Sequence, residues 1–187
     1  MPEKTTIEEV NGLGHDEFVS RFGALYERSP WVAEGAWRER PFDGLPALHE
    51  AFVRAMYDAP RGRQLALIRA HPDLAGKAAV AGELTLESTL EQASAGLDHL
   101  TLEEYEAFTR LNTGYREKFG FPMIVCVREH TKESILAQAE ARMEHSREEE
   151  VEVALGEIAK IARLRLEDLV ETDPGDNEDE RRRAGGR

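Results

Sequence analysis

The sequence predicts an all-α fold, because apolar residues recur mostly at helical spacing, helix-start signals are frequent and strand signals are few. Leu155, Ile158 and Ile161, for example, follow one another at intervals of three, with Glu and Lys among the positions between them. The one run rich in β-branched residues is Met123–Val127, and a single strand has no neighbour with which to pair. We therefore expect a single-domain bundle of about eight helices with irregular, pocket-forming segments.

Helix starts are marked by the capping box, in which Ser or Thr precedes Glu by three residues and both side chains cap the helix. The pattern occurs at Thr5–Glu8, Ser88–Glu91, Thr101–Glu104 and Ser146–Glu149. Together with the apolar spacing, these signals predict helices over residues 15–27, 30–38, 45–58, 61–70, 88–95, 101–118, 131–145 and 147–170.

The segments between and after these helices differ in composition. Irregular joints are expected at residues 40–44, 70–82 and 120–131. The stretch 171–187 has six acids, four arginines and three glycines, and no apolar residue larger than alanine, so it cannot bury enough surface to become ordered. We expect a helical domain over residues 1–170 and a disordered charged tail over 171–187.

Charge and composition narrow the class of protein. The 187 residues carry 24 Lys and Arg against 37 Asp and Glu, a formal net charge of −13. Such an acidic chain repels phosphate backbones and anionic lipid, so neither nucleic acid nor a membrane is an expected partner. The longest apolar run, Phe121–Val127, is too short to cross a bilayer. The single Cys126 and the polar, acidic first residues predict a reducing, cytoplasmic location.

Motifs for metals and nucleotide cofactors are missing from the sequence. None of the six histidines has a second His four residues on, and Val53 stands where a zinc-binding partner of His49 would be. With one cysteine, a structural zinc site is not expected. The sequence also lacks a Gly-rich phosphate loop and a dinucleotide fingerprint, so its motifs point to neither a metal nor a nucleotide cofactor.

His71 lies at a predicted corner of the backbone. Pro72 disfavours the α region for the residue before it, so the preceding helix should stop here and fix the imidazole after its last turn. A His at such a place is suited to general acid or base catalysis near neutral pH. The alternative is structural: His71 bonds a carbonyl at the helix end, and Asp73 caps the next turn.

Three further elements allow both a structural and a functional interpretation. Ser88–Gln92 is either a helix cap or a carboxylate and carboxamide placed near the anion-binding start of a helix. Phe119–Val127 is either core filling or an irregular segment whose backbone groups meet a small ligand. Near the C-terminal end, Arg163 or Arg165 points partly inward and then needs an anionic partner.

In this order, the elements His-Pro-Asp-Leu-Ala-Gly-Lys, Ser-x-x-Glu-Gln, Phe-Gly-Phe-Pro and Leu-Arg-Leu-x-Asp-Leu-Val resemble one family. It is the family of 2-oxo-4-hydroxy-4-carboxy-5-ureidoimidazoline (OHCU) decarboxylases, and the resemblance runs from about Gly14 to Val170. It implies an all-helical homodimer that uses no cofactor. The implied reaction is decarboxylation of OHCU to (S)-allantoin, the last step of urate oxidation in purine breakdown.

The resemblance also implies roles for particular residues. His71 is the proton-transfer residue, Glu91 its catalytic companion and Arg165 the catalytic arginine, preferred to Arg163 because it stands in the Leu-Arg-Leu pattern. Which of His71 and Glu91 is the acid and which the base stays open. The implied substrate contacts are Pro72, Ser88, Thr89, Leu90, Gln92, Met123, Ile124, Val125, Cys126 and Val127.

Two other functions remain compatible with the sequence. One is a helical module that binds ureides without turning them over. The other is a different ureide enzyme on the same scaffold, such as a hydrolase or a racemase.

Overall fold

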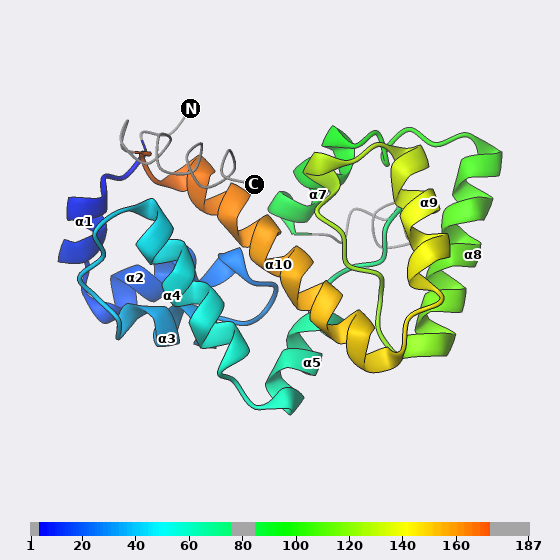
Figure 1. Cartoon of the computed structure of the whole chain (residues 1–187). Helices are drawn as coiled ribbons and strands as arrows, with labels where there is room; N and C mark the ends of the chain where they lie inside the picture. The colour runs from blue at the N-terminus through cyan, green and yellow to red at the C-terminus, as the bar shows by residue number, and fades with distance from the viewer. Residues whose placement is uncertain (1–3, 76–84, 173–187) are drawn as a thin grey trace, which may run out of the picture. The chain divides into compact units, whose positions relative to one another are not determined.

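The computed structural model describes residues 4–75 and 85–172, and these form helices joined by irregular segments (Figure 1). Within them there is no strand beyond an isolated parallel bridge between Thr5 and Val170, which confirms the all-α prediction. None of the helices described is long and apolar enough to span a membrane. Nearly all of the predicted tail, residues 173–187, and most of the 70–82 joint lie outside the described residues.

The observed helices follow the predicted order. The predicted helix 15–27 is divided into α2 and the short 3-10 helix η1, and α1 had not been predicted as a helix. The elements are α1 (Ile7–Gly12), α2 (His15–Phe22), η1 (Gly23–Leu25), α3 (Trp31–Trp37), α4 (Leu45–Tyr57), α5 (Arg61–Ala70), α7 (Leu86–Ser94), α8 (Leu102–Phe119), η2 (Val127–Glu129), α9 (Lys132–Arg142) and α10 (Arg147–Leu169).

The capping boxes are confirmed at two of their four predicted places. Thr101 caps α8 with Glu104, and Ser146 exchanges the same pair of bonds with Glu149. The first box is shifted by one residue, because the pair that caps α1 is Thr6 with Glu9.

The prediction of a cap at Ser88 is wrong. Thr85 caps α7, and its side chain accepts the Ser88 N–H at 3.2 Å. Ser88 therefore lies inside the first turn of the helix, and Glu91 and Gln92 follow one turn later.

The described chain divides into two compact units, each with its own aromatic core. One takes the described residues of Met1–Gln64 and Ala159–Arg187, and the other those of Leu65–Ile158. In the first, Phe52 stacks on Phe18 and on Tyr26, with ring centroids 5.9 Å apart in both pairs.

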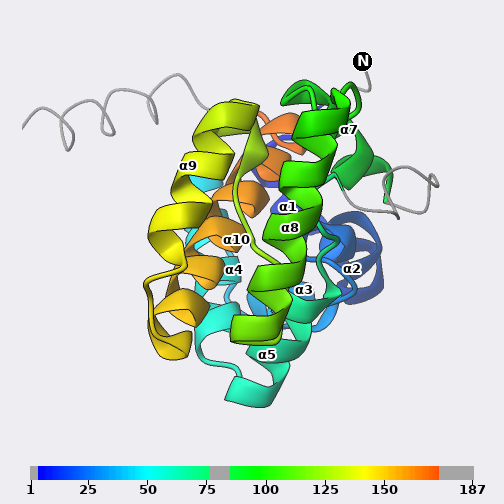
Figure 2. The same ribbon diagram turned by 90° about the vertical axis from the view of Figure 1, so that its right-hand side faces the viewer.

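In the second unit, α8 packs against α9, and the irregular stretch before η2 is visible between these two helices in the view of Figure 2. Phe119, at the end of α8, contacts the rings of Tyr115 and Phe121. The irregular stretch is thereby anchored in the core of this unit.

Gly35 marks the close approach of α3 to α4. A Cβ atom added at Gly35 would stand 2.7 Å from the Cβ of Ala55, closer than real Cβ atoms approach. Gly35→Ala should therefore lower the free energy of unfolding in urea by about 1–3 kcal/mol. The matched control is Gly62→Ala on α5, because no described atom lies within 4 Å of its added Cβ. That variant should gain up to about 1 kcal/mol from helix propensity; equal stabilities for the two would contradict the close approach.

His49 makes the stability of the first unit depend on pH. Its Nε2 donates to the Ala159 carbonyl at 2.9 Å, and burial lowers the pKa of the ring below its ordinary value of 6.5. The unfolded chain therefore takes up a proton at a higher pH than the folded chain does, so stability falls as the pH drops below 6.5. His49→Gln should make the free energy of unfolding fall less between about pH 7 and pH 5. His99→Gln is the control, since the His99 side chain is 89% exposed; an unchanged slope in His49→Gln would contradict the assignment.

Candidate active site

His71 lies at the corner that the sequence predicts, directly after the last residue of α5. It is 8% exposed, and its Nδ1 lies 3.0 Å from the Leu67 carbonyl oxygen. A carbonyl only accepts, so Nδ1 carries the proton and Nε2 is the nitrogen that gains or loses one. The bond is the one that the structural alternative predicted. It also fixes the tautomer and the ring orientation, as a proton-transfer residue requires.

The loop after His71 is held in place by two buried side-chain amides. Gln92 accepts the Ala75 N–H at 2.9 Å and donates to the Asp73 carbonyl at 3.3 Å. Asn112, on α8, donates to the Leu74 carbonyl at 2.8 Å. Three successive residues of the loop are thus fixed by hydrogen bonds from α7 and α8.

Asp73 forms an ion pair with Arg116 of α8. The Arg116 Nε lies 2.9 Å from one carboxylate oxygen and 3.2 Å from the other, and both side chains are partly exposed. The predicted cap of the next turn by Asp73 falls on residues outside the described range. The ion pair adds a second link between the loop and α8, beside the bond from Asn112.

The predicted stretch Ser88–Gln92 is divided between two faces of α7. Ser88 and Gln92, four residues apart, are both buried. Thr89 lies on the exposed face and donates to the Thr85 carbonyl, and Leu90 is 63% exposed. Glu91 lies between these faces and is partly exposed. Gln92 is already committed to the loop after His71, so its carboxamide acts there as a brace.

The predicted segment Met123–Val127 is buried throughout, with exposures of 1–6%. Side chains hold two of its backbone groups: Arg142 Nη1 donates to the Ile124 carbonyl at 2.8 Å, and Glu157 accepts the Cys126 N–H at 2.7 Å. The segment leads into η2, which packs against α7. Within the second unit, the structure therefore brings this segment next to the helix that carries Glu91 and Gln92.

Arg165 belongs to the other unit, where it is buried and 6% exposed. Its Nη1 donates to the Leu25 carbonyl at 3.1 Å, and its Nη2 lies 3.4 Å from Glu27 Oε1. Arg163, in contrast, is exposed and pairs with Glu167 at 2.9 Å. Of the two arginines, Arg165 is thus the inward one, and its anionic partner is a carboxylate 138 residues away in the sequence.

Several residues of this arrangement were missed by the sequence analysis. They are Glu27, Arg142 and Glu157, all of them buried and polar. A polar residue inside an apolar helix face is the only local signal of such a role, and it does not name the partner. In the described part of the chain, no three His, Cys, Asp or Glu residues are grouped to hold a metal.

Fold and site together define an all-helical protein whose candidate site is built from a buried imidazole, side-chain amides and backbone groups. The model of the OHCU decarboxylase family matches residues 11–167, and the chain belongs to this family. The resemblance stated from the motifs is thereby confirmed.

Individual relatives agree with this assignment. The chain is 48% identical over 161 residues to a 2-oxo-4-hydroxy-4-carboxy-5-ureidoimidazoline decarboxylase of Haloferax volcanii, covering 86% of this chain and 94% of the relative. It is 45% identical to the protein of the same name from Halalkalicoccus jeotgali, covering 89% and 92%. Among solved structures, an (S)-allantoin synthase is 30% identical with a TM-score of 0.72, covering 89% of this chain and 54% of that one.

Proposed function

We propose that this protein decarboxylates OHCU to (S)-allantoin without a cofactor. The observation that carries the proposal is the buried His71, whose Nδ1 is fixed on the Leu67 carbonyl while Gln92 and Asn112 hold the loop that follows. Family membership and the names of the relatives support the same reaction.

The chemistry of the substrate suits such a site. Its carboxylate stands on a ring carbon next to the C=N bond of the imidazoline, so the electrons left by carbon dioxide can spread into the ring. The protein must then hold the carboxylate out of the ring plane, stabilise the charge on the ring and deliver a proton to one face. Delivery to one face yields a single enantiomer.

The proposed roles follow these three tasks. His71 and Glu91 carry out the proton transfer, and either of them can be the acid. Arg165 stabilises the developing negative charge through its guanidinium. The proposed substrate contacts are Pro72, the four residues Ser88, Thr89, Leu90 and Gln92 of α7, and the stretch Met123–Val127, largely through its backbone.

Release of carbon dioxide tests the proposal. OHCU is formed in situ from urate by a urate oxidase and a hydroxyisourate hydrolase, and carbon dioxide is measured with and without this protein. The proposal requires carbon dioxide well above the spontaneous rate, one molecule for each substrate consumed. A hydrolase or racemase would not accelerate it, and a ureide-binding module would raise its melting temperature with allantoin but turn nothing over.

We also propose that the protein is a homodimer and works in the cytoplasm. The dimer is what membership of the family suggests, and the buried single Cys126 suits a reducing compartment. Sedimentation velocity at micromolar concentration should give twice the chain mass of 21.0 kDa, and a monomer would refute the dimer. Fractionation of the native host cells should recover the protein with cytoplasmic markers.

A further inference from the structure

The segment Met123–Val127 is unusual because it is buried and yet belongs to no helix until η2 begins. Buried backbone groups outside regular structure need partners from elsewhere in the protein. Two buried, charged side chains from different helices supply them here: Arg142 of α9 and Glu157 of α10.

These two contacts orient the peptide groups on either side of Val125. In a trans peptide, the C=O of one residue and the N–H of the next point in opposite directions. Because the Ile124 carbonyl points to Arg142, the Val125 N–H points away from Arg142. Because the Cys126 N–H points to Glu157, the Val125 carbonyl points away from Glu157. Arg142 and Glu157 thus orient the Val125 N–H and the Val125 carbonyl indirectly, because each of them binds the other polar group of the same peptide bond.

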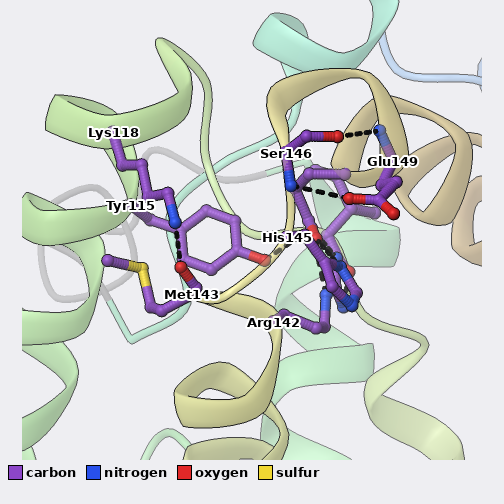
Figure 3. Close-up of polar contacts among 9 residues, drawn as sticks. Tyr115, Lys118, Arg142, Met143, His145, Ser146 and Glu149 are labelled. Carbon is purple, nitrogen blue, oxygen red and sulfur yellow. Dashed lines mark hydrogen bonds and ion pairs between the residues drawn. The ribbon is translucent and has the colours of Figure 1, made fainter.

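Arg142 is itself held by a buried carboxylate. Its Nε lies 3.0 Å from Glu150 Oε1, its Nη2 contacts the same oxygen, and Glu150 is fully buried. The Tyr115 hydroxyl also donates to Oε1, and His145 Nδ1 lies 2.9 Å from Oε2. Figure 3 shows Tyr115, Arg142 and His145 pointing toward one another. Burial, followed by the bond to Glu150, raises the pKa of Tyr115, so the phenol stays protonated and donates.

We propose that Arg142, fixed by Glu150, and Glu157 are positioning residues that hold the backbone of Met123–Val127 in the conformation that binds substrate. This inference rests on the proposed function, because it assigns that segment to the substrate pocket. The cluster acts through the Ile124 and Cys126 peptide groups and contacts no reacting atom.

Four variants test the proposal: two that remove a contact to the segment and two that serve as controls. Arg142→Lys keeps the charge beside Glu150, but one ammonium group cannot contact both Glu150 and the Ile124 carbonyl as the guanidinium does. Glu157→Gln keeps an oxygen that accepts the Cys126 N–H, whereas Glu157→Met removes it. Arg110→Gln is the surface control, since the Arg110 side chain is 72% exposed.

The first readout is steady-state kinetics with OHCU formed in situ. Arg142→Lys and Glu157→Met should each raise KM about tenfold, the effect of losing one well-formed hydrogen bond, with kcat changed less than KM. Glu157→Gln and Arg110→Gln should stay within about twofold of the unmodified chain. An unchanged KM in the first two variants, with only a lower melting temperature, would show that the cluster stabilises the fold and nothing more.

The second readout is independent of activity. Amide hydrogen exchange of the peptide covering Met123–Val127 should be faster in Arg142→Lys and Glu157→Met, while α2 to α4 keep their protection. If the unmodified chain turned over no substrate but this exchange still increased, the proposed function would fail and the bracing would stand. If turnover were normal and exchange did not change, the bracing itself would be refuted.

Discussion

Replacing His71 by Asn is expected to lower kcat by about two to four orders of magnitude, the usual loss when a general acid or base is removed. Asn cannot titrate, but its amide can still donate a hydrogen bond toward the Leu67 carbonyl, so the helix end keeps a partner. The folded structure should therefore survive with little change in melting temperature.

The rate of formation of optically active allantoin gives the kinetic part of this test, and thermal unfolding gives the structural part. His99→Asn is the matched control, because the same substitution is made at an exposed side chain. A His71→Asn variant that still produced one enantiomer at the original rate would exclude His71 as the proton-transfer residue.

Replacing Glu150 by Leu is expected to produce the largest loss of stability, about 3–5 kcal/mol in the free energy of unfolding. The carboxylate is fully buried and accepts from Tyr115, Arg142 and His145. Removing it leaves a buried guanidinium without its anion, and burying an uncompensated charge costs more than the original pair contributes.

Urea unfolding of Glu150→Leu, compared with Glu106→Gln, measures this effect. Glu106 is 58% exposed and lies 3.9 Å from Arg110, so its loss should change stability by less than about 1 kcal/mol. Similar losses in the two variants would mean that the Glu150 cluster is no more important than a surface ion pair.

Local signals predicted the helical framework well because each of them acts over a few residues. Pro72 ends α5 where expected, and two of the capping boxes form as predicted. One error arose where two local patterns compete: Thr5 and Thr6 both precede a Glu by three residues, but the Thr5 backbone N–H donates to the Leu169 carbonyl at 2.9 Å instead. That contact joins the two ends of the described chain, and no local pattern reveals it.

The candidate site shows the same limit more strongly. His71, Glu91 and Arg165 were proposed from the family motifs, whereas helix periodicity alone left open whether Arg163 or Arg165 points inward. Their partners could not be chosen, because Gln92 meets residues 17 and 19 positions away and Glu27 meets Arg165 across 138 positions. Such pairs depend on how helices pack, which periodicity and capping do not specify.

The most direct test of the central claim is the circular dichroism of allantoin during turnover. OHCU is generated in situ from urate by the two upstream activities, this protein is added, and the ellipticity is followed with time. The account predicts rapid appearance of one enantiomer, (S)-allantoin, at a rate proportional to the concentration of this protein. Slow formation of racemic allantoin at the spontaneous rate would contradict it and would make a ureide-binding protein on this scaffold the better explanation.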